Sequence, residues 1–136
     1  MKKMALIWMM ALAFPLVAHE HKAPHGGSLV EIGDEFAHLE LVLDADSGKL
    51  TAFVLDGEAE KSLRIRQKAL VLKLGASSVT LRAEDNPLTG EKPGDCSEFS
   101  ARSAKFRARR KFEGRFGPLT ILGKTFKGLK ATFGGP

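Results

Sequence analysis

The chain has 136 residues, of which 43% are hydrophobic and 27% are charged, and its formal net charge is +5. This length is typical of one small domain with an apolar core, and the single cysteine excludes an internal disulfide as a source of stability. Residues 19–96 carry 14 acidic and 9 basic side chains, whereas residues 97–136 carry 2 acidic and 10 basic side chains. The net charge therefore conceals an acidic first part and a basic second part.

Residues 1–18 have the layout of a secretory signal peptide. Lys2 and Lys3 precede an apolar run from Met4 to Val17, and Ala18 is a small residue suited to cleavage. The run is short for a spanning helix, although an uncleaved N-terminal anchor is the alternative. We expect a periplasmic or otherwise exported protein with no stable membrane span after cleavage. All four methionines lie in this segment, so the mature chain would have no thioether ligands for Cu(I).

Beyond residue 27, alternating apolar and polar residues and frequent turn residues predict strands rather than helices. The clearest strand is Phe36 to Leu43, whose alternation places His38 and Glu40 on one face. The other strands are expected at residues 28–32, 50–55, 78–83, 106–112, 119–122 and 125–133. Residues 63–74 are expected to form one long strand or two short ones interrupted near Gln67-Lys68. We predict an all-β domain over residues 28–136, a single small antiparallel β-sandwich or barrel of about eight strands. A flexible, histidine-rich segment over residues 19–27 would precede it.

The N-terminal histidines form the first set of candidate metal ligands. If cleavage follows Ala18, the mature chain begins His19-Glu20-His21. An α-amine, two backbone amides and an imidazole at the third position form a square-planar site that suits Cu(II) or Ni(II). Glu20 permits this geometry, because proline there would remove a required amide nitrogen. The alternative is a loose terminus with incidental histidines, since chain ends are often poorly ordered.

His25, His38 and Glu40 form the second set. The glycines that follow His25 allow the chain to fold tightly over the sheet edge, and the strand at residues 28–32 would pair with the strand of His38. Both features would bring His25 near His38 and Glu40, with His21 as a further ligand, in a site suited to Zn(II) or Cu(II). The alternative is a hydrogen-bonded surface histidine beside a solvated glutamate.

Three short motifs lie together near the start of the predicted domain: Pro24-His25-Gly26-Gly27, His38-Leu39-Glu40-Leu41-Val42, and the hairpin from Gly48 to Asp56. Together with Gly33 they resemble the His-Gly-Gly-containing periplasmic module of heavy-metal efflux adaptor (membrane-fusion) proteins and of small stand-alone exported relatives. The resemblance covers residues 24–57. It implies a role in metal resistance or trafficking, with His25, His38 and Glu40 as candidate ligands. The chain lacks the long helical hairpin and lipoyl-like segments of a complete adaptor, so it would not bridge a pump by itself.

Several other functions are disfavoured. No histidine follows Cys96, which argues against a blue-copper site, and no spacing indicates a Cys–His catalytic pair. Export disfavours a nucleic-acid partner, and no phosphate-binding glycine loop opens a helix. We therefore do not expect an enzyme.

The leading hypothesis is an exported periplasmic protein that sequesters or delivers Cu(II), Zn(II) or Ni(II) in connection with heavy-metal efflux, with an efflux-system or envelope protein as partner. His19 and His21 would act as flexible capture ligands, and His25, His38 and Glu40 as a more ordered site. Because only neutral imidazoles bind a metal, affinity should fall below about pH 6.5.

The alternative hypothesis is a non-metal envelope interaction module with a basic C-terminal β-surface. Its basic residues, Arg107, Arg109, Lys111 and Lys127, would contact an anionic polymer or an acidic protein. Ordinary solvated strand faces are the simpler interpretation of the same residues.

Overall fold

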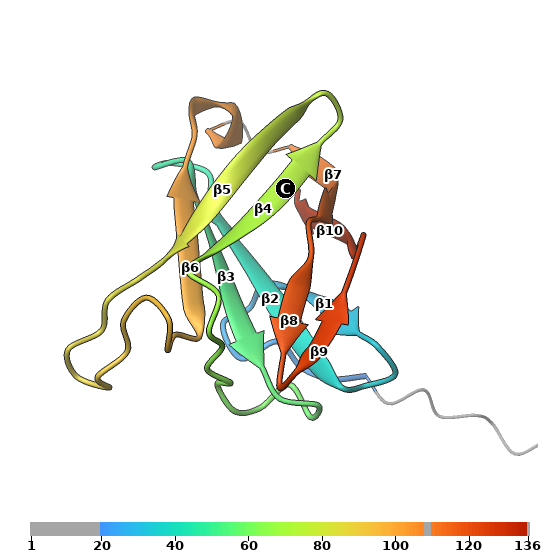
Figure 1. Cartoon of the computed structure of the whole chain (residues 1–136). Coiled ribbons are helices and arrows are strands. Elements are labelled where there is room, and N and C mark those ends of the chain that lie inside the picture. The colour runs from blue at the N-terminus through green and yellow to red at the C-terminus, as the bar shows by residue number, and fades with distance from the viewer. Residues whose placement is uncertain (1–19, 108–109, 136) are drawn as a thin grey trace, which may run out of the picture.

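The computed structural model describes residues 20–107 and 110–135, which form ten β-strands and one short 3-10 helix (Figure 1). The strands are β1 (Ser28–Ile32), β2 (Ala37–Asp44), β3 (Lys49–Leu55), β4 (Ala69–Leu74), β5 (Ser77–Ala83), β6 (Glu98–Arg102), β7 (Lys111–Phe116), β8 (Leu119–Ile121), β9 (Lys124–Phe126) and β10 (Lys130–Gly134). The helix is η1 (Ala104–Phe106). The strand pairings are antiparallel, which confirms the predicted all-β class.

Eight of these strands form one sheet in the order β1-β2-β3-β6-β5-β4-β7-β10, and β8 pairs with β9 in a separate hairpin. The two end strands, β1 and β10, lie close together, so the sheet curls into a nearly closed barrel (Figure 1). Such closure leaves little exposed strand edge. Within the described part of the chain, no helix is long and apolar enough to cross a membrane.

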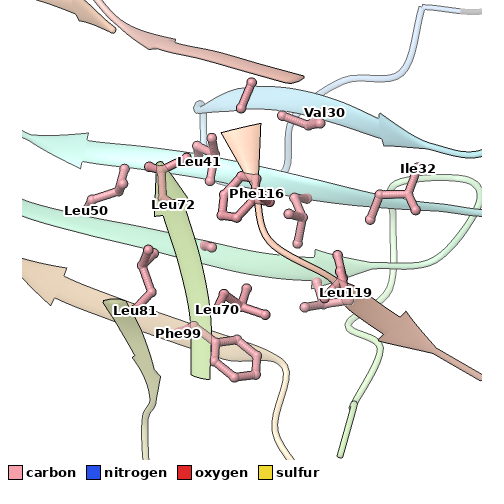
Figure 2. Close-up of a cluster of buried hydrophobic side chains, with 14 of the residues drawn as sticks. Val30, Ile32, Leu41, Leu50, Leu70, Leu72, Leu81, Phe99, Phe116 and Leu119 are labelled. Carbon is pink, nitrogen blue, oxygen red and sulfur yellow. The ribbon is translucent and has the colours of Figure 1, made fainter. Parts of the chain in front are cut away.

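Inward-facing aliphatic and aromatic side chains fill the barrel (Figure 2). On β2 and β3 these side chains alternate with outward-facing residues, as the sequence predicted, and Leu39, Leu50 and Val54 are completely buried. The β8–β9 hairpin adds Leu119 and Ile121 to the same core. Burying a side chain of this size contributes about 1.5–3 kcal/mol relative to leaving it exposed. The core therefore supplies the stability that a single cysteine could not.

The predicted strand over residues 106–112 is wrong. Phe106 belongs to η1, and β7 begins only at Lys111. Phe106 and Phe112 nevertheless meet edge to face, with ring centroids 5.3 Å apart, and both rings lie beside Phe133. The apolar pattern thus reflected an aromatic cluster built from two elements rather than one strand.

Three further regions differ from the prediction. Of residues 63–74 only β4 is a strand; it begins just after the break expected near residues 67–68, and before the break Ile65 makes a single bridge to Cys96. Residues 125–133 are not one strand, because β9 and β10 belong to different sheets. Strand β6 was not predicted, because Phe99 is the one large apolar residue in its sequence and alternation is therefore weak. Its buried Phe99 instead anchors it between β3 and β5.

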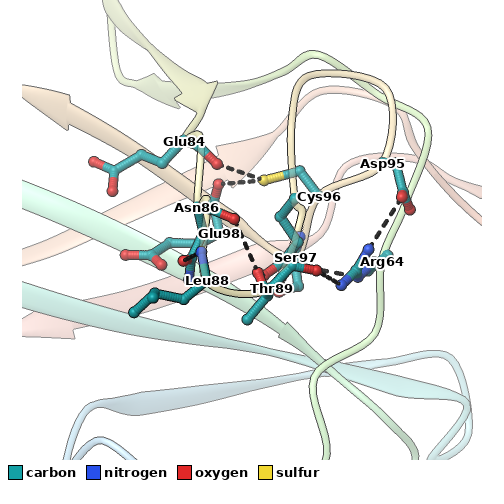
Figure 3. Close-up of polar contacts among 10 residues, drawn as sticks. Arg64, Glu84, Asn86, Leu88, Thr89, Asp95, Cys96, Ser97 and Glu98 are labelled. Carbon is teal, nitrogen blue, oxygen red and sulfur yellow. Dashed lines mark hydrogen bonds and ion pairs between the residues drawn. The ribbon is translucent and has the colours of Figure 1, made fainter.

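The loop between β5 and β6 is held by Arg64 (Figure 3). The guanidinium donates to the carboxylate of Asp95 at 3.1 Å and to the carbonyl oxygen of Thr89 at 2.6 Å. Glu91, in the same loop, accepts hydrogen bonds from the backbone N–H and the hydroxyl of Ser97. This loop is therefore a closed polar network fixed to the barrel.

Cys96 is completely buried beside this network. Its Sγ–H group lies within hydrogen-bond distance of the carbonyl oxygens of Glu84 and Glu98, at 3.1 and 3.2 Å (Figure 3). Since the thiol is enclosed and paired, it serves as a small core residue.

Candidate functional site

The outer face of β2 carries His38 and Glu40, on the side opposite to the core residue Leu39. Both side chains are nevertheless buried, with His38 only 3% and Glu40 0% exposed. His21 and His25, in the coil that precedes β1, contact them directly. The N-terminal coil therefore covers the outer face of β2 and encloses its two polar residues.

Glu40 is the anchor of this coil. Its Oε2 accepts the backbone N–H of His25 at 2.8 Å and that of Gly27 at 2.9 Å. Its Oε1 lies 3.0 Å from the same His25 nitrogen and 2.7 Å from His25 Nδ1. Hydrogen bonds to a charged group contribute about 1.5–3 kcal/mol each, and a buried carboxylate without them would be costly. Both oxygens of Glu40 are thus occupied by the protein itself.

The two glycines of the motif have distinct structural roles. Gly26 adopts a left-handed conformation, with φ of +72°, and its N–H donates to the carbonyl of Ala23 to close a turn. At Gly27 a Cβ atom would collide with the carbonyl oxygen of Leu41 on β2. The first glycine provides the turn and the second permits close backbone contact, as expected from the sequence.

His25 is held between Glu40 and the ring of Phe53. Its imidazole stacks on that ring with centroids 3.8 Å apart and an interplanar angle of 6°. Phe53 lies directly opposite Glu40 in the β2–β3 register. A carboxylate accepts hydrogen bonds, so we assign the proton of His25 to Nδ1, which leaves a lone pair on Nε2. The side chain of His25 remains 43% exposed, and Nε2 is its free ligating atom.

His38 forms a second cluster with His21. The two rings meet edge to face with centroids 5.0 Å apart. His38 Nδ1 lies 3.1 Å from the carbonyl oxygen of Asp56, which can only accept, so Nε2 of His38 carries the lone pair. His21 Nε2 lies 3.2 Å from Oε1 of Glu35 in the β1–β2 turn.

The loop that presents the Asp56 carbonyl is organised by the Asp56 carboxylate. The backbone N–H groups of Glu60 and Lys61 donate to its Oδ1 at 2.9 and 3.3 Å. The hydrogen bond from Glu60, more than that from Lys61, holds the pKa of the Asp56 carboxyl below its usual range. This loop packs closely on the β1–β2 turn, since a Cβ on Gly57 would lie 2.5 Å from the carbonyl oxygen of Glu35.

The structure thus divides the predicted ligands into two pairs, His25 with Glu40 and His21 with His38. His19 lies outside the described residues. Within residues 20–107 and 110–135, no three His, Cys, Asp or Glu side chains are grouped so as to hold one metal ion. Sequence reasoning missed Glu35 and Asp56; no sequence signal marks a backbone carbonyl as the partner of a histidine.

The basic residues singled out in the sequence do not share one strand. Arg107 follows η1, Lys111 opens β7, and Lys127 lies between β9 and β10. Arg109 lies outside the described residues. A different set of cations, described below, lies side by side on the barrel surface.

Comparison of the chain with protein-family models, with curated proteins and with solved structures finds no match in any of the three.

Proposed function

We propose that this chain is an exported, periplasmic metal-binding protein that takes up Cu(II), Zn(II) or Ni(II) for sequestration or for delivery to a heavy-metal efflux system. The observation that carries the proposal is the His21–His38 pair, with ring centroids 5.0 Å apart. Two imidazoles at this separation are close enough to bind one ion through nitrogen bonds of about 2.0 Å. The resemblance of residues 24–57 to the efflux-adaptor module points to the same chemistry.

The surroundings of His38 support a ligand role. A metal-binding histidine usually donates its second ring N–H to a carboxylate or a backbone carbonyl, which fixes the tautomer and the ring orientation. The Asp56 carbonyl is such an acceptor for Nδ1 of His38. Nε2 of His38 is therefore the proposed ligating atom, on a ring that the protein already holds in place.

Glu35 is the proposed third ligand. In a tetrahedral site with bonds of about 2.0 Å, two ligand atoms are separated by about 3.3 Å. The 3.2 Å between His21 Nε2 and Glu35 Oε1 matches this separation. An ion would replace the proton that these two atoms share, and side-chain rotation would have to bring His38 and Glu35 to the same ion as His21, because the three are not grouped around one point in the described residues.

His25, Glu40 and His19 take secondary roles in this proposal. Because both oxygens of Glu40 accept N–H groups, Glu40 orients His25 rather than binding the ion. The exposed Nε2 of His25 is a separate, weaker capture site. If cleavage follows Ala18, the α-amine and ring of His19 add nitrogen ligands two residues before His21.

The test is isothermal titration with Cu(II), Zn(II) and Ni(II), using protein purified after expression of the full chain. Mass spectrometry of the same sample fixes its N-terminus and the metal stoichiometry. We expect one site bound more tightly than by an N-terminally acetylated peptide of residues 19–27, which lacks the α-amine of the square-planar site, and a loss of about ten-fold or more in H21Q and in H38Q. The matched control, H25Q, should leave the tight site nearly unchanged.

Because His38 is buried, an unfolded H38Q variant would also lose binding. H38Q is therefore compared with a variant at the partly exposed His21, H21Q, and thermal unfolding shows whether each variant is folded. Binding no tighter than that of the peptide would refute the proposal. So would unchanged affinity in a folded H21Q variant.

A further inference from the structure

Three cations form a row across the outer face of β4, β7 and β10. Lys73 on β4 lies directly opposite Arg115 on β7, and Arg115 lies directly opposite Lys130 on β10. Residues directly opposite in antiparallel strands point to the same face, with Cβ atoms about 4.5–5.5 Å apart. All three side chains are exposed. We call Lys73, Arg115 and Lys130 the cationic row.

This arrangement is unfavourable in the free protein. Like charges directly opposite one another destabilise a sheet. Within the described residues, lysine and arginine form ion pairs at Lys49–Glu84, Arg64–Glu91 and Arg64–Asp95, and none of these involves the row. None of the three cations therefore forms an ion pair within the described residues, although the carboxylate of Glu113 lies two residues before Arg115 on the same face of β7.

The row borders a hollow in the surface. The pairing of β4 with β7 comprises Leu72↔Phe116 and Lys73↔Arg115. A hollow of about 470 Å³ lies beside it, lined by the row together with Gly75, Glu113 and Gly114. A Cβ built on Gly75 would meet no atom within 4 Å, so no neighbouring side chain fills the space beside this glycine.

Arg115 is held at one end of its side chain. Its Nη1 donates to the carbonyl oxygen of Gly128, in the segment between β9 and β10, at 3.0 Å, which anchors one nitrogen of the guanidinium. The other guanidinium N–H groups remain for a ligand, and a fixed guanidinium binds phosphate oxygens in a fork-like manner.

We propose that the cationic row binds a phosphate-bearing anion with more than one negative charge. Neighbouring strands are about 4.7–4.9 Å apart, so two adjacent cations reach one phosphate group and the whole row spans two linked or neighbouring phosphates. An uncharged ligand would leave the three cations unpaired. The phosphates of anionic lipid headgroups and of a soluble polyphosphate share this chemistry. The site lies on different strands from the histidines, so it does not depend on the proposed metal site.

The test uses metal-free protein purified after expression of the full chain. Sodium tripolyphosphate is titrated calorimetrically at low salt, and co-sedimentation compares phosphatidylglycerol vesicles with phosphatidylcholine vesicles. The double variant K73Q/K130Q is matched by K61Q/K92Q, which removes the same charge from exposed lysines elsewhere. We expect K73Q/K130Q to weaken binding by about ten-fold and the control by less than about two-fold.

The two probes distinguish the sources of the phosphate. Binding to tripolyphosphate supports a soluble phosphate ligand, and selective binding to phosphatidylglycerol vesicles supports a lipid headgroup. Failure to bind either probe overturns the proposal. Equal weakening in the two double variants also overturns it, because binding would then follow net charge rather than the row. Thermal unfolding of both variants confirms that each is folded.

Discussion

The outer face of β2 and the outer face of β4, β7 and β10 differ in how their charged side chains are paired. On β2 the chain brings its own coil over the sheet, and Glu40 is satisfied by N–H groups of His25 and Gly27. On the other face the cationic row lies open, with like charges opposite one another. The comparison teaches that a buried carboxylate paired within this protein holds the coil in place, whereas the exposed row forms no ion pair in the described residues and is the proposed contact for a phosphate from outside.

The largest expected effect is at Glu40, where the paired face depends on one carboxylate. E40A leaves the backbone N–H groups of His25 and Gly27 without their acceptor, so we expect a loss of about 2–4 kcal/mol in the free energy of unfolding. Urea denaturation measures the loss, and hydrogen exchange should show faster exchange at both amides. E58A, at an exposed glutamate, is the control. A loss below about 0.5 kcal/mol in E40A would mean that the coil is not anchored by this residue.

The next largest effect is a difference in stability between substitutions at the two glycines of the coil. G27A introduces a Cβ that collides with the Leu41 carbonyl, so it should destabilise the protein by about 1–3 kcal/mol. G26A meets no neighbouring atom and has only the strain of its positive φ, so about 1 kcal/mol is expected. Chemical denaturation of both variants checks the order. Equal losses would show that close contact with β2 is unimportant.

At the cationic row the expected change in the free energy of unfolding has the opposite sign. K73Q/K130Q removes like-charge repulsion around Arg115, so it should stabilise the protein by about 0.2–1 kcal/mol at low salt. The gain should shrink as salt screens the charges of the parent protein. Thermal unfolding at two salt concentrations measures this difference, with K61Q/K92Q as the control. Destabilisation by K73Q/K130Q would mean that the lysines support the fold.

The smallest expected effect concerns pH and Asp56. Hydrogen bonds from Glu60 and Lys61 lower the pKa of its carboxyl in the folded protein. The ionised carboxylate therefore adds stability above the unfolded pKa of about 3.9, and this stability is lost as the pH falls through the lower folded pKa. D56N should melt below the parent protein at neutral pH, and the gap in Tm should close in acid. The exposed position of the carboxyl keeps the gap small. A gap that persists in acid would contradict this assignment.

Much of the histidine-bearing face could be predicted from the sequence. Alternation along β2 placed His38 and Glu40 together, and the glycines after His25 indicated a tight approach of the coil to the sheet. The pairing of His21 with His38 could not be predicted, because it depends on the path of a coil without periodicity. Nor does a sequence pattern show that the Asp56 carbonyl meets His38.

The cationic row was beyond sequence reasoning for a different reason. Its members are 42 and 15 residues apart along the chain and become neighbours only through the order β4-β7-β10. The sequence pattern instead favoured a basic strand face at residues 107–111. Arg107 follows η1 and Lys111 opens β7, so these two residues do not share a strand. Local patterns reveal strands and their faces, whereas the juxtaposition of distant strands needs the register.

The enclosed thiol of Cys96 makes local opening of the protein measurable. Because the chain has one cysteine, and its sulfur lies against two carbonyl oxygens with no exposed surface, a thiol-reactive dye can label it only while the β5–β6 region is open. The labelling rate of the native protein therefore counts opening events without any engineered probe. The same enclosure keeps this single cysteine from joining two molecules through a disulfide.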